Sequence, residues 1–209
     1  MKKQEMIDIL KSNVEEKEFA HIALSMLNLN GRICEVGVRE GGNFENLIKC
    51  NPELAVAVDC WEEVQDKPEY NDIGLSQIML DDQYQRVVDK FGSLPNVSIV
   101  RNFSIESAEM FPDGYFDYVY IDAAHTYDEV VKDINAWYPK VKKGGILAGH
   151  DYFPDTRIWR GDPCGVYQAV NEFAEKNNLE VDHTTNVDLE GGPGVACTSF
   201  FIIIPEESK

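Results

Sequence analysis

The sequence contains no hydrophobic run long enough to cross a membrane, and it has few positive charges. Its apolar runs have the length of strands, and Phe200–Ile204 is among the longest. The 19 lysines and arginines are outnumbered by 37 aspartates and glutamates, so the formal net charge is −18. A general nucleic-acid binder needs a positive surface, and an anionic membrane repels an acidic protein. We therefore expect the chain to bind neither nucleic acid nor a membrane.

Cysteine is scarce, and no C-x-x-C pair is present. An odd number of dispersed cysteines does not suit a disulfide framework and is typical of reduced thiols in a cytosol. The N-terminus has two lysines, but acidic residues follow where a signal peptide needs its apolar stretch. We therefore predict a cytoplasmic protein. The five cysteines are Cys34, Cys50, Cys60, Cys164 and Cys197.

The size of the chain favours one domain. Its 209 residues, 44% of them hydrophobic, are enough for one substantial core and too few for two ordinary domains. We predict a single domain over residues 1–209, with a helical extension at 1–30 and the core at 31–205. The extension has apolar residues near helical spacing, so we expect one or two amphipathic helices that end at Asn30 and Gly31.

From residue 32 onward, short apolar runs alternate with longer segments of helical pattern. Such alternation indicates a parallel sheet covered by helices on both faces. The last two runs, separated by Gly191–Gly194, indicate an antiparallel hairpin. The sequence thus predicts an α/β fold: a Rossmann-like, doubly wound, mostly parallel seven-stranded sheet with a C-terminal antiparallel hairpin. The expected strands are Arg32–Val36, Leu54–Val58, Val97–Val100, Tyr118–Ile121, Ile146–Ala148, Glu180–Thr184 and Ser199–Ile204. The expected helices are Phe44–Cys50, Ser76–Phe91, Ile105–Met110, Tyr127–Tyr138 with a capping box from Thr126, and Val166–Asn177.

A glycine-rich turn follows the first expected strand. Glu35 lies near the end of that strand, and Gly37 and Gly41 precede the next helix. Glycines let a ligand approach the backbone closely, and the start of a helix offers free N–H groups. The spacing G-x-x-x-G-G differs from the G-x-G-x-x-G pattern of dinucleotide-binding proteins, which disfavours a nicotinamide or flavin cofactor. A tight turn without a ligand is the alternative.

An acidic residue, Asp59, ends the second expected strand. It follows the glycine turn by roughly 20 residues, where an acid can accept hydrogen bonds from ribose hydroxyls. Trp61 is a candidate to stack near the adenosine, and the alternative is an aromatic residue of the core. Together with the glycine turn, these residues predict a nucleoside site at the carboxyl edge of the sheet.

These motifs resemble those of the class I S-adenosylmethionine-dependent methyltransferases, and the likeness extends over residues 31–205. The resemblance implies that Glu35, Gly37 and Gly41 hold the methionine part of S-adenosylmethionine. It also implies that Asp59 binds the ribose. The terminal hairpin suits this family, whose last strand is antiparallel, and does not suit the dehydrogenases.

Three further segments carry the resemblance. Asn102–Ile105 resembles the segment that lies along the adenine, so Ser104 and Ile105 are the candidates for contacts there. Phe116–Asp122 resembles the motif of the fourth strand, and Lys143–Leu147 resembles the turn into the fifth. In this family Asp122 would also contact the cofactor.

Asp122 ends the fourth expected strand, and His150 and Asp151 follow the fifth. Neighbouring strands lie about 4.8 Å apart, so these side chains can meet at one point of the edge. Two converging carboxylates repel each other unless a proton or a cation lies between them. We therefore predict a divalent cation held by Asp122, His150 and Asp151. Aspartate oxygens suit Mg²⁺ or Mn²⁺, and an added imidazole favours Mn²⁺, Fe²⁺ or Zn²⁺. Alternatively, Asp122 contacts only the cofactor and His150 packs beneath it.

The same residues resemble the metal site of catechol-type and sugar O-methyltransferases, although that group has Asp-Asp or Asp-Asn where this chain has His150-Asp151. His125 follows Asp122 by three residues, the spacing at which catechol-type enzymes carry their catalytic lysine. The resemblance therefore implies that His125 is the general base. His150 is the second candidate if no metal binds it, and a purely structural histidine is the alternative.

Two segments rich in aromatic and charged residues, Glu62–Leu75 and Tyr152–Cys164, interrupt the regular alternation. We interpret them as flaps that bind the methyl acceptor, and exposed loops are the alternative. The expected function is metal-assisted O-methylation of a small molecule, such as a sugar, a phenol or a secondary metabolite. Two other functions remain open: a metal-independent methyltransferase with a histidine base, and a non-catalytic cofactor-binding module. A third, a nucleotide-sugar or NAD-binding enzyme, is disfavoured by the glycine spacing and the terminal hairpin. The N-terminal helices are candidates for a homodimer surface.

Overall fold

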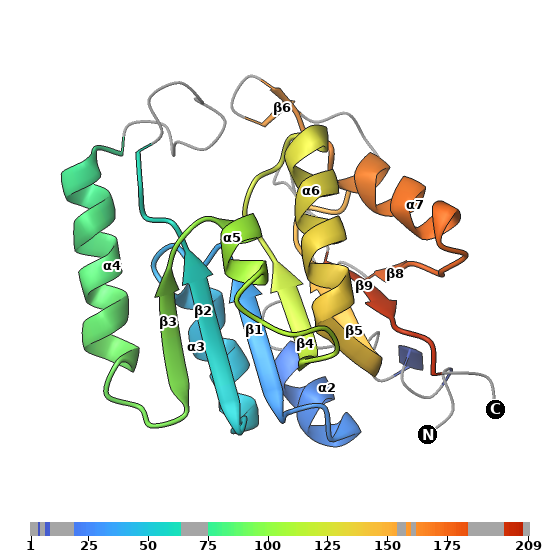
Figure 1. The fold of residues 1–209 in the computed structure, drawn as a ribbon, viewed down its shortest axis with the longest axis horizontal. Coiled ribbons are helices and arrows are strands. Elements are labelled where there is room, and N and C mark those ends of the chain that lie inside the picture. The colour runs from blue at the N-terminus through green and yellow to red at the C-terminus, as the bar shows by residue number, and fades with distance from the viewer. Residues whose placement is uncertain are drawn as a thin grey trace, which may run out of the picture.

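A computed structural model of the chain describes residues 4, 7–8, 19–63, 75–153, 158–159, 162–183 and 199–206. Its centre is a seven-stranded sheet with the strand order β3-β2-β1-β4-β5-β9-β8 (Figure 1). The first five strands in this order are parallel, whereas β9 pairs antiparallel with both β5 and β8. The predicted Rossmann-like sheet with its antiparallel C-terminal strands is therefore confirmed. The turn predicted at Gly191–Gly194 lies outside the described residues.

The strands are close to the predicted apolar runs, except that the fifth begins earlier. Glycine is unfavourable inside strands, so the apolar pattern starts only at Ile146, after Gly144 and Gly145. The strands of the sheet are β1 (Arg32–Val36), β2 (Leu54–Asp59), β3 (Val97–Arg101), β4 (Phe116–Ile121), β5 (Val141–Gly149), β8 (Asp182–His183) and β9 (Phe200–Ile203). A separate antiparallel pair consists of β6 (Ile158–Trp159) and β7 (Asp162–Pro163).

Six α-helices with described bounds surround the sheet. They are α2 (Phe19–Leu27), α3 (Gly42–Leu47), α4 (Gln77–Phe91), α5 (Ser104–Ala108), α6 (Tyr127–Trp137) and α7 (Val166–Lys176), with 3₁₀ turns η1 (Ile48–Cys50) and η3 (Tyr138–Lys140). The N-cap of α6 is Thr126, but its side chain makes no capping hydrogen bond, so the expected capping box is wrong in that respect. None of the described helices is long and apolar enough to span a membrane.

The central strands of the sheet, β1, β2 and β4, are buried on both faces because most of their residues are apolar. Side chains alternate along a strand: in β2, Ala55 and Ala57 join one core cluster and Val56 and Val58 join the other. The first cluster includes residues of α2, α3 and α4, and the second includes residues of α5, α6 and α7. In Figure 1 the second set lies in front of the sheet.

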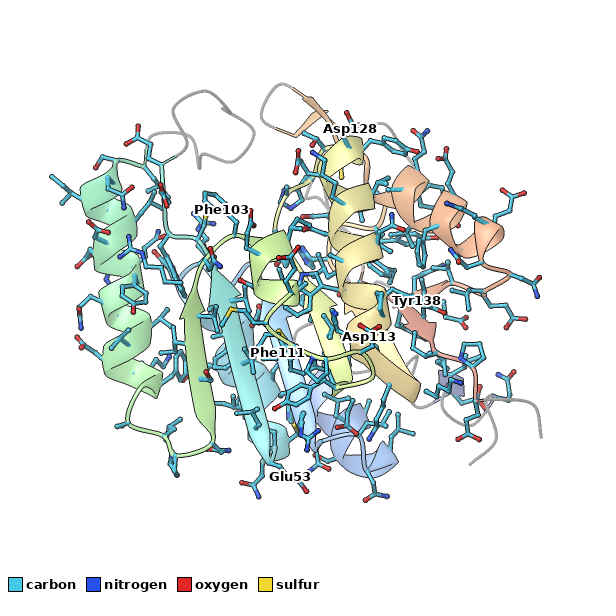
Figure 2. All side chains as sticks on the ribbon, in the orientation of Figure 1. Glu53, Phe103, Phe111, Asp113, Asp128 and Tyr138 are labelled. Carbon is cyan, nitrogen blue, oxygen red and sulfur yellow. The ribbon has the colours of Figure 1, made fainter. Side chains whose placement is uncertain are left out.

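The parallel strands all end at one edge, which we call the carboxyl edge (upper edge in Figure 1). Phe103, which directly precedes α5, lies toward this edge, and Glu53, which precedes β2, lies at the opposite one (Figure 2). Doubly wound sheets bind their ligands at the carboxyl edge. The fold therefore places the loops after β1, β2, β4 and β5 where a site is expected.

Tight packing at Gly149, the last residue of β5, generates a stability prediction. A Cβ there would lie 2.5 Å from Phe200 Cε1 and 2.6 Å from the Ile121 carbonyl oxygen. We expect Gly149→Ala to lower the free energy of unfolding by about 1–3 kcal/mol through overpacking. Gly42→Ala is the matched control, because a Cβ at Gly42 meets no atom within 4 Å. Urea denaturation measures both, and equal midpoints for the two variants would contradict the strand packing.

Candidate active site

The glycine turn after β1 is held between the ends of two other strands. Gly37 has a φ of +90°, and its N–H donates to the carbonyl of Val58 at 2.8 Å. A Cβ at Gly37 would lie 2.0 Å from the Asp122 carbonyl oxygen, so no other residue fits. Gly41, with a φ of +80°, is the N-cap of α3, and a Cβ there would lie 2.7 Å from Phe91 Cε2. Both glycines are therefore required by the backbone path of the turn.

Glu35 places a buried carboxylate directly before this turn. The residue is 1% exposed, and its Oε1 accepts a hydrogen bond from Asn43 Nδ2 at 3.1 Å. Asn43 was not predicted from the sequence, although a polar residue in the first turn of the helix after a glycine turn is a signal for it. A buried carboxylate at the carboxyl edge suits a ligand that carries positive charge.

Asp59 lies at the end of β2 and accepts two backbone hydrogen bonds. Its Oδ2 accepts from the Arg39 N–H at 2.7 Å, and its Oδ1 accepts from the Trp61 N–H at 2.9 Å. Trp61 itself is 1% exposed and packs in the first core cluster, with its ring centroid 5.0 Å from that of Tyr84. This burial corresponds to the core-aromatic alternative rather than to stacking on an adenosine.

The hydroxyl of Ser104, the candidate at the adenine segment, is engaged within the protein. It donates to Asp133 Oδ1 at 2.5 Å and accepts from Trp137 Nε1 at 2.9 Å. Ser104 is the first residue of α5, and its partners lie on α6. The structure thus uses this side chain to join two helices, and Ile105 lies partly buried beside it. Contacts of both residues with a cofactor stay a prediction.

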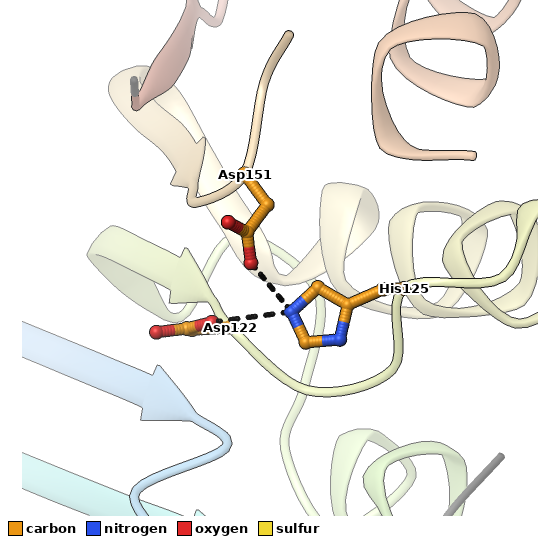
Figure 3. A group of neighbouring side chains, drawn as sticks. All are labelled: Asp122, His125 and Asp151. Atoms are coloured by element: carbon orange, nitrogen blue, oxygen red, sulfur yellow. Dashed lines mark ion pairs between the residues drawn. The ribbon is translucent and has the colours of Figure 1, made fainter. Parts of the chain in front are cut away.

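Two aspartates and two histidines converge at the ends of β4 and β5 (Figure 3 shows three of them). His125 Nε2 lies 2.6 Å from Asp151 Oδ2 and 3.8 Å from Asp122 Oδ1. His150 Nδ1 approaches the same two oxygens, at 3.4 Å and 3.8 Å. The convergence predicted for Asp122, His150 and Asp151 is therefore present, and His125 is closer to its centre than His150 is.

The electrostatics of this cluster reflect two neighbouring carboxylates. Burial by itself lowers the pKa of His125, but hydrogen bonds and charge interactions with Asp122 and Asp151 outweigh it and raise the pKa to about 9. Burial raises the pKa of Asp151, yet the two imidazoles hold that pKa well below its usual range. At neutral pH His125 therefore carries the proton that compensates the carboxylates, and in that state it cannot accept another.

The donor atoms of the cluster fit a divalent cation. One ligand atom each from Asp122, His125 and Asp151 lies within 4.8 Å of the other two. The remaining oxygen of Asp151, Oδ1, is buried and has no hydrogen-bond partner among the described residues. Asp151 also has a φ of +55°, a costly conformation for a residue with a side chain. Two carboxylates and an imidazole are a donor set that suits Mn²⁺, Fe²⁺ or Zn²⁺.

The chain returns to this cluster after the second expected flap. The Gly165 N–H donates to the His125 carbonyl at 2.7 Å, and the Cys164 thiol lies 3.7 Å from the Asp151 carbonyl. A Cβ at Gly165 would lie 2.3 Å from the Tyr127 nitrogen. The start and the end of the segment 152–164 are thus fixed next to the histidine. Residues 64–74, 154–157, 160 and 161 of the two flaps lie outside the described residues.

Comparisons with known proteins agree with the observed fold. A methyltransferase-domain family model matches residues 34–152. The chain is 32% identical over 83 residues to uncharacterized protein R132 of Acanthamoeba polyphaga mimivirus, a match that covers 37% of this chain and 35% of that protein. The match thus spans about a third of the length of this curated relative.

Solved structures of similar fold cover nearly the whole chain. Cofactor-bound Rv0187 from MTB has a TM-score of 0.63 and 15% identity, covering 97% of this chain and 86% of its own. A SAM-dependent O-methyltransferase from Thermotoga maritima has a TM-score of 0.61 and 12% identity, with 98% and 72% covered. A SAM-dependent methyltransferase from Aquifex aeolicus has a TM-score of 0.57 and 18% identity, with 98% and 99% covered. At these identities the likeness establishes the fold.

The buried carboxyl group of Asp133 generates a prediction about pH. Burial raises its pKa from 3.8 to about 7, against the lowering effect of the Ser104 hydrogen bond. The pKa of Asp133 is higher in the folded protein than in the unfolded one. The contribution of its protonation to stability is therefore full below pH 4 and is lost as the pH rises through 7. Asparagine does not ionise, so we expect Asp133→Asn to keep its stability as the pH rises. The free energy of unfolding of the variant relative to wild type should be about 3–4 kcal/mol higher at pH 8 than at pH 4.

Urea denaturation of wild type and variant at both pH values measures this difference. The control is Asp89→Asn on α4, because Asp89 is exposed. A stability difference between Asp133→Asn and wild type that is independent of pH would show that Asp133 is ionised in the folded protein throughout this range.

Proposed function

Because the chain belongs to the methyltransferase-domain family, we propose that it transfers the methyl group of S-adenosylmethionine to an oxygen of a small molecule, assisted by a divalent cation. The observation that carries this proposal is the convergence of Asp122, His125 and Asp151 at the edge that also holds the glycine turn. Donor, cation and acceptor would meet there, so the protein contributes chiefly by positioning the reacting atoms for an in-line displacement.

Residues of three strand ends would hold the cofactor. S-adenosylmethionine carries a sulfonium, an α-amino and an α-carboxyl group, and a ribose diol. The buried carboxylate of Glu35 would balance positive charge, and the turn from Gly37 to Gly41 leaves the backbone accessible to the methionine part. Asp59 would accept hydrogen bonds from the ribose hydroxyls, because a carboxylate at the end of β2 offers about four acceptor sites and two backbone N–H groups fix its orientation.

Asp122, His125 and Asp151 would hold the cation. When bound, a divalent cation lowers the pKa of an acceptor hydroxyl and stabilises the developing negative charge. His125 would give up its proton on binding, because a metal-ligating imidazole is neutral. The 2.6 Å approach of His125 to Asp151 supports His125 as the ligand, and the place of His150 beside both aspartates supports it as the base. The sequence suggested the reverse, with His150 as the ligand and His125 as the base.

The acceptor that we propose is a small neutral or cationic molecule with a hydroxyl group, such as a sugar, a phenol or a secondary metabolite. The net charge of −18 disfavours an anionic polymer as the acceptor. Both flap segments begin and end at the carboxyl edge, where they would cover such a molecule.

A metal-independent transfer is the second candidate, and one observation favours it. The His125–Asp151 pair at 2.6 Å already balances charge without a cation. In that case His150 alone would take the proton of the acceptor, and chelators would not alter the rate. The two candidates share the cofactor residues and differ only in this cluster.

The cofactor site generates a binding prediction. A ligand that binds only the folded protein raises its melting temperature, so we expect S-adenosylhomocysteine to do so and NAD to have no effect. Asp59→Asn should weaken S-adenosylhomocysteine binding by at least about tenfold, the effect of one lost charged hydrogen bond. Asp82→Asn is the control, because that side chain is exposed on α4. Calorimetry that detects no binding to the wild type would overturn the proposed cofactor.

The acidic cluster generates a separate prediction about metal. We expect Mn²⁺ to bind the wild type in the presence of S-adenosylhomocysteine and Asp151→Asn to weaken that binding at least about tenfold, since it removes one charged ligand. Asp113→Asn is the control, because Asp113 is exposed and pairs with Lys140 away from the cluster. Titration calorimetry measures both variants. Unchanged Mn²⁺ affinity in Asp151→Asn would leave the metal-independent candidate.

A further inference from the structure

Three hydrogen bonds link the glycine turn to the end of β2 in a closed ring. The Arg39 N–H donates to Asp59 Oδ2 at 2.7 Å, and the Trp61 N–H donates to Asp59 Oδ1 at 2.9 Å. The indole Nε1–H of Trp61 then donates to the Arg39 carbonyl at 2.8 Å. Both polar backbone groups of Arg39, which lies between Gly37 and Gly41, are therefore fixed by residues 59 and 61.

The ring holds its residues in unfavourable backbone conformations. Arg39 has a φ of +52° and Trp61 a φ of +43°. The left-handed region costs energy for any residue with a side chain, and a bulky one is rarely found there unless its surroundings impose it. At Trp61 this conformation occurs together with the hydrogen bond from its N–H to Asp59 Oδ1, directly after β2.

Trp61 is anchored from the outside by two other elements. Its carbonyl accepts from Gln77 Nε2 of α4 at 3.0 Å and from the Arg101 guanidinium of β3 at 2.9 Å. Its ring is buried and packs next to Tyr84 of α4. The position of the indole N–H is therefore fixed by α4 and β3. Through its hydrogen bond to the Arg39 carbonyl, the indole fixes the glycine turn relative to these elements.

We propose that Trp61 is a positioning residue for the cofactor: its indole N–H fixes the glycine turn relative to the carboxylate of Asp59. This rests on the proposed function, in which the turn holds the methionine part of the cofactor and Asp59 holds the ribose. Trp61 sets the distance between the turn, which contacts the methionine part, and Asp59, which contacts the ribose. It thereby affects the affinity for S-adenosylmethionine without contacting the cofactor itself. Its effect therefore depends on Asp59.

Trp61→Phe tests this role, because it keeps a buried aromatic ring and removes the N–H. We expect the dissociation constant of S-adenosylhomocysteine to rise about tenfold, the effect of one buried hydrogen bond. The KM for S-adenosylmethionine should rise by the same factor, with kcat unchanged at saturation. Leu24→Ala is the control: it removes side-chain volume from the same core cluster, at α2, and should lower stability without changing the affinity.

A double-mutant cycle with Asp59→Asn separates positioning from general stability. If Trp61 acts through Asp59, Trp61→Phe should change the affinity of the Asp59→Asn protein less than twofold. Gln77→Ala removes one hydrogen bond to the Trp61 carbonyl from a partly buried position, and we expect about a threefold loss of affinity in the same direction. It provides the test if Trp61→Phe does not fold.

Three outcomes decide the matter. Wild-type binding of S-adenosylhomocysteine, with a tenfold loss in Trp61→Phe that falls below twofold in the Asp59→Asn background, supports the positioning role. Wild-type binding with an unchanged affinity in Trp61→Phe, or with additive effects in the cycle, overturns it and leaves the proposed function intact. No binding to the wild type overturns the proposed function itself.

Discussion

The carboxyl ends of β1, β2 and β4 approach so closely at Gly37 that no side chain fits between them. This constraint organises the whole edge. The turn must be glycine, the strands on either side must keep their register, and the acids at their ends lie at the same edge of the sheet. Glu35, Asp59 and Asp122 come from distant parts of the sequence, and the packing of the backbone at Gly37 makes them neighbours.

The acids at this edge are compensated in two different ways. Glu35 accepts a hydrogen bond from the side-chain amide of Asn43, and Asp59 accepts from the backbone N–H groups of Arg39 and Trp61. Asp151 instead faces an imidazolium, His125, which a cation could replace. The net charge around Asp151 therefore depends on the proton that His125 carries.

The sequence predicts features that depend on neighbouring residues and misses those that depend on distant partners. Continuous apolar runs predict the buried parallel strands because both faces of the sheet are covered, and strand ends predict the place of Asp59 and Asp122. The hydroxyl of Ser104, by contrast, is occupied by Asp133, a residue 29 positions away that no local pattern associates with it. Trp61 is ambiguous for another reason: a buried tryptophan and a ligand-stacking tryptophan have the same sequence signature.

Gly165 has a consequence for redesign of the protein. Its N–H is bonded to the backbone of His125, and any side chain on it would strike Tyr127. The segment that it ends begins directly after Asp151. The two ends of the segment 152–164 are therefore fixed beside His125, and Tyr152 and Phe153 at its start are buried in the protein. A redesign between these ends that keeps Tyr152, Phe153 and Gly165 would leave the surroundings of His125 unchanged.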